Sequence, residues 1–68
     1  MFHSEYYAAR LASIDAEIRR KQITASLIFS ENKLCQRRAM AAIKRIEILR
    51  MDYDALAAIA SQEASQGA

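Results

Sequence analysis

Side chains that are mostly apolar or small recur along this chain at alternating intervals of four and three residues. In the first half, the repeating positions are Tyr7, Leu11, Ile14, Ile18, Lys21, Ala25 and Ile28. In the second half, they are Cys35, Ala39, Ala42, Ile46, Leu49, Tyr53, Leu56 and Ala60. This interval keeps one face of an α-helix toward a partner. With no proline and one glycine, the sequence also lacks the residues that tight turns and phosphate-binding loops need. The pattern therefore predicts an all-α fold.

The two halves of the pattern are in phase through Asn32, so two folds are compatible with it. One is a single helix about 85 Å long at 1.5 Å per residue, paired with a second copy in a parallel coiled coil. Asn32 would then be the buried polar residue that sets the register. The other is an antiparallel hairpin that turns near Asn32, with Ser30 as the N-cap of the second helix. The hairpin is expected to form one domain over residues 1–60, with helices at about 4–29 and 33–60, a turn at 30–33 and a frayed tail at 61–68.

Two observations favour the hairpin over the single long helix. Folding the chain at Asn32 matches the apolar layers without adjustment, so that Ile14 faces Leu49 and Ile18 faces Ile46. A two-stranded rod would also leave six large apolar side chains in water, which suits a soluble protein poorly.

A second set of apolar side chains lies away from the expected seam, and it predicts self-association. The core of a chain shorter than about 70–80 residues rarely supplies more than ~3–5 kcal/mol. The single cysteine cannot form an internal disulfide. We therefore expect the hairpin to dimerise into a four-helix bundle. The outward residues available to the dimer or to a target are Ile23, Leu27, Met40, Ile48 and Met51.

Positive charge is concentrated around the expected turn. Residues 19–45 contain eight of the ten lysines and arginines and a single acid, Glu31. Such an end attracts an acidic surface, although the same charges can simply keep an apolar molecule dissolved. A protein target is favoured over nucleic acid, because Phe29 is the one aromatic residue in this region and no DNA-recognition motif is present. The candidate contacts are Arg19, Arg20, Lys21, Arg37, Arg38, Lys44 and Arg45.

No arrangement in the sequence suits catalysis or metal binding. His3 is the only histidine, and Cys35 is expected to act as a small hydrophobic residue in the seam. A nucleophile would lack a base, and a metal would lack a cluster of ligands. We therefore expect no catalytic residue, no metal, no cofactor and no enzyme activity. One candidate anchor for a partner lies near the N-terminus: Phe2, Tyr6 and Arg10.

The sequence favours a small protein-binding module. It has no targeting segment and no apolar run approaching ~18 residues, which favours a cytoplasmic location away from membranes. In length and layout, the expected dimer resembles the plasmid copy-control type of helical-hairpin homodimer, but no residue motif extends this resemblance to RNA binding. We expect an inhibitor or modulator of the phage or plasmid accessory kind, which blocks a surface of its target. The alternatives are a nucleic-acid-binding hairpin dimer that acts through its basic turn end, and a structural subunit of a larger assembly.

Overall fold

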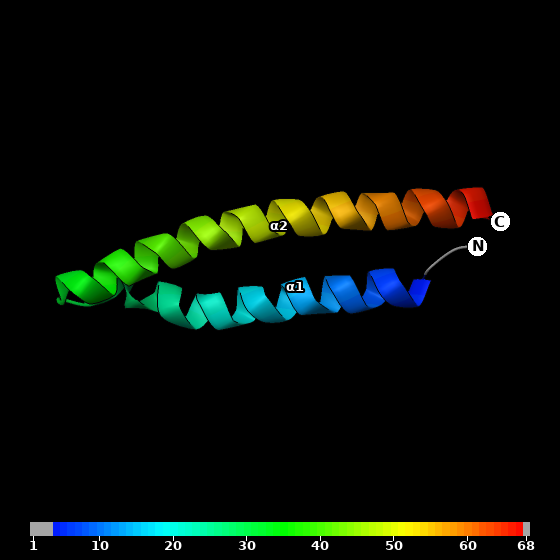
Figure 1. Cartoon of the computed structure of the whole chain (residues 1–68). Helices are drawn as coiled ribbons and strands as arrows, with labels where there is room; N and C mark the ends of the chain where they lie inside the picture. The colour runs from blue at the N-terminus through cyan, green and yellow to red at the C-terminus, as the bar shows by residue number, and fades with distance from the viewer. Residues whose placement is uncertain (1–3, 68) are drawn as a thin grey trace.

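The chain folds into an antiparallel helical hairpin. The computed structural model describes residues 4–67, with α1 at Ser4–Ala25, a short 3₁₀ helix η1 at Ser26–Phe29, and α2 at Lys33–Gly67. The two long helices lie side by side over a body of 54 × 15 × 11 Å (Figure 1). The prediction of an all-α hairpin is confirmed, and the single long helix is wrong.

The turn is closed by hydrogen bonds rather than by glycine. The Asn32 side-chain oxygen accepts the backbone N–H groups of Leu34 at 2.8 Å and Cys35 at 3.3 Å, and its carbonyl accepts that of Gln36 at 3.0 Å. This is the geometry of an N-cap, which satisfies donors that the first helical turn leaves unpaired. The Ser30 hydroxyl instead accepts the Asn32 backbone N–H at 3.1 Å. The expectation that Ser30 caps the second helix is therefore wrong, and Asn32 is the cap.

Removing this cap is expected to destabilise the protein without changing its fold. Asn32→Ala leaves the Leu34 and Cys35 N–H groups without their acceptor, so the free energy of unfolding should fall by about 1 kcal/mol. Urea denaturation followed by circular dichroism measures this change. Asn32→Asp is the matched control, because it keeps the acceptor and should stay near the wild type. Equal stability of Asn32→Ala and the wild type would contradict the capping role.

The first helical segment ends at Phe29, as expected, but its last turn differs in type. The last turn of the first helix, Ser26–Phe29, is 3₁₀ rather than α, as is common where a helix tightens at its end. Here the Ser26 hydroxyl donates to the Ile23 carbonyl at 2.6 Å.

At the other end, α2 continues to Gly67, so the expected end near residue 60 is wrong. The segment 61–66 has no helix breaker, so the helix continues through it.

The core is a thin seam between the two helices. Ile18, Ile46 and Leu49 pack into a buried cluster, and Ile14 and Ala25 lie against it. Closer to the turn, the buried side chains on α2 are those of Ala39 and Ala42, which are small enough to let the helices approach closely. Within residues 5–66, no polar or charged side chain is buried. All these core residues belong to the four-and-three pattern.

Candidate interaction surface

A shallow depression lies between η1 and the first half of α2. Its residues, hereafter the turn-end depression, are Ile28, Lys33, Gln36, Arg37, Met40, Ala41 and Lys44. The lining is mostly apolar, because the aliphatic stems of the cations contribute to it together with Ile28, Met40 and Ala41. The three cationic groups are exposed, and no ion pair forms with any of them among the described residues. The depression therefore combines an apolar lining with uncompensated positive charge.

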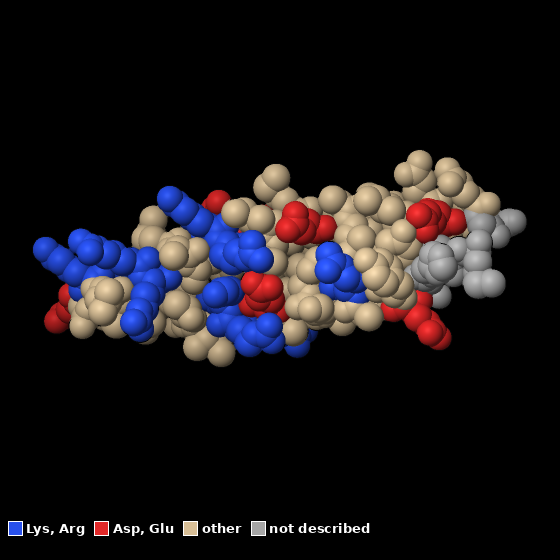
Figure 2. Space-filling view, viewed as in Figure 1, with Lys and Arg blue, Asp and Glu red and all other residues tan. Residues whose placement is uncertain are grey.

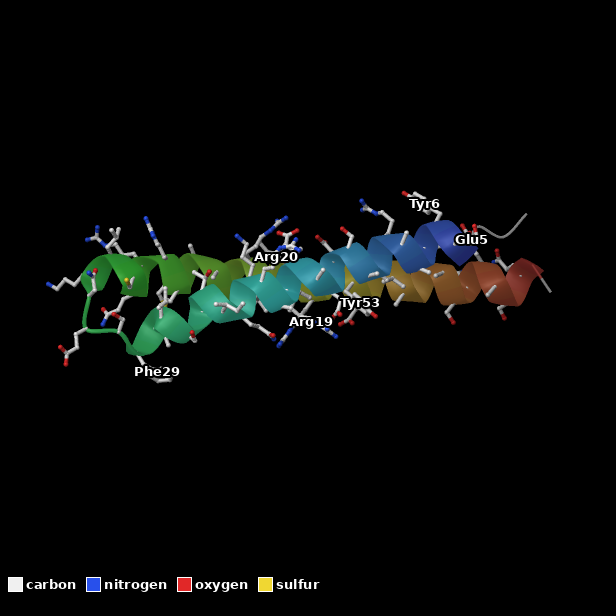
Figure 3. The ribbon with its side chains drawn as sticks, turned by 90° about the horizontal axis from the view of Figure 1, so that it is seen from below. Glu5, Tyr6, Arg19, Arg20, Phe29 and Tyr53 are labelled. Carbon is white, nitrogen blue, oxygen red and sulfur yellow. The ribbon has the colours of Figure 1, made fainter. Side chains whose placement is uncertain are left out.

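Charge and exposed apolar area coincide at this end of the molecule. Figure 2 shows lysine and arginine side chains gathered over the turn end, with carboxylates mostly farther along the hairpin. Phe29 projects from the tip, with 90% of its surface exposed (Figure 3). Large apolar groups are seldom left so exposed without a contact to make.

The seven cations predicted as one contact set do not act as a single group. Arg37, Arg38 and Lys44 are exposed on α2 near the turn, and Lys21 is half-buried. Arg19 and Arg20 project to different sides of α1 (Figure 3).

Two of the seven are already paired with acids. Arg19 lies 3.2 Å from Asp15 within α1, and Arg45 of α2 lies 3.3 Å from Glu17 of α1. Their charge is largely offset, so the strongest positive region is narrower than the sequence indicates and is centred on α2.

The predicted outward apolar residues are all exposed, and they are distributed over α1, η1 and α2. Ile23 on α1 has 74% of its surface exposed and Met51 on α2 has 71%. Leu27, Met40 and Ile48 are also exposed. Three further large apolar residues, outside the predicted contacts, are also exposed: Phe29, Leu34 and Ile59.

The candidate N-terminal anchor is only partly described by the structure. Phe2 lies outside the described residues. Tyr6 is exposed and meets Tyr7 edge to face, with ring centroids 5.5 Å apart. The hydrogen bond with Glu63, followed by partial burial, raises the pKa of the Tyr7 hydroxyl. Arg10 is exposed and lines a groove between α1 and α2.

The described residues contain few other groups that could bind a metal or react. Within residues 4–67, no three side chains of the metal-ligating kinds gather in one place. Cys35 is a free, half-buried thiol in the first turn of α2, and His3 lies outside the described part of the chain. No helix between residues 4 and 67 has both the length and the apolar content needed to cross a lipid bilayer.

No known protein family, curated protein or solved structure matches this chain.

Proposed function

We propose that this chain is a small, non-enzymatic protein-binding module that modulates a target by covering part of its surface. The observation that supports this most is the turn-end depression, in which an apolar lining meets the exposed cations Lys33, Arg37 and Lys44. A surface of this kind suits an apolar side chain flanked by carboxylates. The free thiol of Cys35 suits a reducing compartment, so we place the protein in the cytoplasm.

The two parts of the depression make different contributions to binding. Apolar contact in a desolvated pocket supplies most of the affinity of such an interface, and Met40 can adapt its shape to the inserted group. The cations accelerate encounter with an acidic surface and select against a basic one.

Loss of two cations is expected to slow binding without unfolding the hairpin. Arg37→Ala together with Lys44→Ala should lower the association rate constant about tenfold at low salt, since electrostatic steering accelerates association by 10 to 1,000-fold. The pair Arg19→Ala and Arg50→Ala is the matched control, because it removes the same number of cations and both residues line a groove away from the depression.

The measurement has two stages. A target is first captured from a lysate of the source cells with the wild type and with both variants. Its association is then followed by surface plasmon resonance over a range of salt concentrations. Equal rates and equal salt dependence for the two double variants would contradict the role of the depression.

Nucleic acid is the second candidate ligand, because residues 33–45 of α2 carry five cations and no acid. Phosphate contacts require only reachable positive groups, and they weaken steeply as salt rises. Fluorescence polarisation with generic DNA and RNA at low salt separates the two proposals. Absence of binding removes the nucleic-acid proposal, whereas tight binding that Arg37→Ala and Lys44→Ala abolish would replace the protein-target proposal.

The third candidate is a structural subunit. It requires the exposed apolar side chains to pack against several copies or partners. Light scattering of the pure protein tests it, since a subunit of this kind should form high oligomers on its own.

A further inference from the structure

One face of α2 carries an apolar stripe that the hairpin itself does not cover. Its residues, hereafter the α2 stripe, are Leu34, Ala41, Ile48, Ala55 and Ile59, and all five are exposed. The first four recur every seven residues, which places them on one face of the helix. The stripe is about 38 Å long at 1.5 Å per residue. It adjoins the turn-end depression and shares only Ala41 with it.

The net charge along α2 has opposite signs on the two sides of Ile48. Residues 33–47 contain five cations and one acid, whereas residues 49–63 contain three acids and one cation. This change in the sign of the charge occurs along the same helix that carries the stripe. A second α2 running in the opposite direction would set each basic half beside an acidic half, whereas a second α2 in the same direction would set like charges together.

We propose that the α2 stripe is covered by a second copy of this chain, packed antiparallel with a two-fold axis beside Ile48. The proposal takes up the dimer expected from the sequence, and it assigns the face and the orientation. In this arrangement, Ile48 meets Ile48 of the partner subunit. Ala41 lies level with Ala55 of the partner subunit. Arg45, whose guanidinium already contacts Glu17 of its own subunit, comes beside Asp52 of the partner subunit at the edge of the stripe.

The accessible surface of the single hairpin is consistent with a missing partner. It measures 5368 Å² for a chain of 7.7 kDa. A monomeric protein of that mass typically exposes about 4,300 Å². The excess of about 1,000 Å² is similar to the ~800 Å² that each partner buries in a stable interface.

A groove beside the stripe provides room for the partner helix. It runs between α1 and α2, and Ile14, Leu56 and Ile59 form part of its lining. Arg10 and Asp52 line it as well, so it offers charges of both signs. A two-fold interface needs such self-complementarity, because each surface element meets a symmetry-related copy.

A matched pair of substitutions tests whether the α2 stripe forms the dimer interface. Ile48→Glu places two carboxylates next to each other across the axis, and the dimer dissociation constant should rise on the order of a hundredfold, as for a central interface residue. Ile23→Glu is the control, since it makes the same change at an exposed position of α1. Sedimentation equilibrium measures the dissociation constant, and circular dichroism checks that both variants keep their helices. A dimer that survives Ile48→Glu, or a wild type that stays monomeric, overturns the proposal.

The orientation is tested by disulfide formation in a Cys35→Ser background. In the antiparallel pair, Ala41→Cys or Ala55→Cys alone should give no covalent dimer on a non-reducing gel, whereas the double variant should give one. A parallel pair would cross-link in each single variant. Rising salt should weaken the antiparallel dimer and strengthen a parallel one.

These measurements use the pure protein, so they are independent of target capture. If the wild type is monomeric and still captures a target through the turn-end depression, only the dimer proposal fails. If the dimer forms as described and no target is captured, only the proposed function fails.

Discussion

Replacement of Leu49 by alanine should remove most of the free energy of unfolding at 25 °C. Leu49 is 3% exposed and belongs to the small cluster with Ile18 and Ile46. Truncating a buried leucine costs about 2–5 kcal/mol. The whole core of so short a chain rarely supplies more than ~3–5 kcal/mol, so one substitution can remove most of the stability.

Met51→Ala is the control for this experiment. Met51 lies two positions along the same helix with 71% of its surface exposed, and its truncation should change the free energy of unfolding by less than about 0.5 kcal/mol. Circular dichroism during urea denaturation measures both variants at the same protein concentration. If Met51→Ala were as damaging as Leu49→Ala, the seam between α1 and α2 would not be the main source of stability.

Replacement of Ala39 by a larger residue should also lower the stability, because it overfills the seam, whereas Leu49→Ala leaves a cavity in it. Ala39 is 0% exposed, so no space for a larger side chain remains between the helices at this position. Ala39→Leu forces the helices apart, and overpacking of this kind costs about 1–3 kcal/mol. Since 1 kcal/mol corresponds to roughly 4–8 °C in a domain of this size, the melting temperature should fall by about 5–20 °C.

The control for overpacking is Ala58→Leu. Ala58 lies on the exposed side of α2, so the same substitution there adds volume without displacing a neighbour. Its melting temperature, followed by circular dichroism, should stay within a few degrees of the wild type. An unchanged melting temperature for Ala39→Leu would mean that the helices separate freely near the turn.

The seam was predictable because it depends on a periodicity that runs through most of the chain. All five buried side chains, from Ile18 to Leu49, lie at positions of the four-and-three pattern. The helix ends were harder to predict, because they depend on single hydrogen bonds. Ser30 and Asn32 are both good capping residues two positions apart, and only the path of the backbone decides between them.

The sign of the charge on the candidate surface was predictable from the sequence, but the set of residues that form the surface was not. The basic character of the turn end follows from the sequence alone, and so does the neutralisation of Arg19 by Asp15 at a spacing of four. The pairing of Arg45 with Glu17 depends on the register between α1 and α2. The turn-end depression joins Ile28 of η1 to residues of α2, so its shape depends on how the 3₁₀ turn meets that helix.

The first and last described residues lie at the end of the hairpin opposite the turn (Figure 1). An affinity tag or a fused reporter at either terminus is therefore separated from the turn-end depression of its own molecule by most of the 54 Å length. In the antiparallel pair, the same tag would lie beside the turn of the other copy. A binding assay should accordingly carry its tag on a long, flexible linker, so that one copy does not shield the recognition surface of the other.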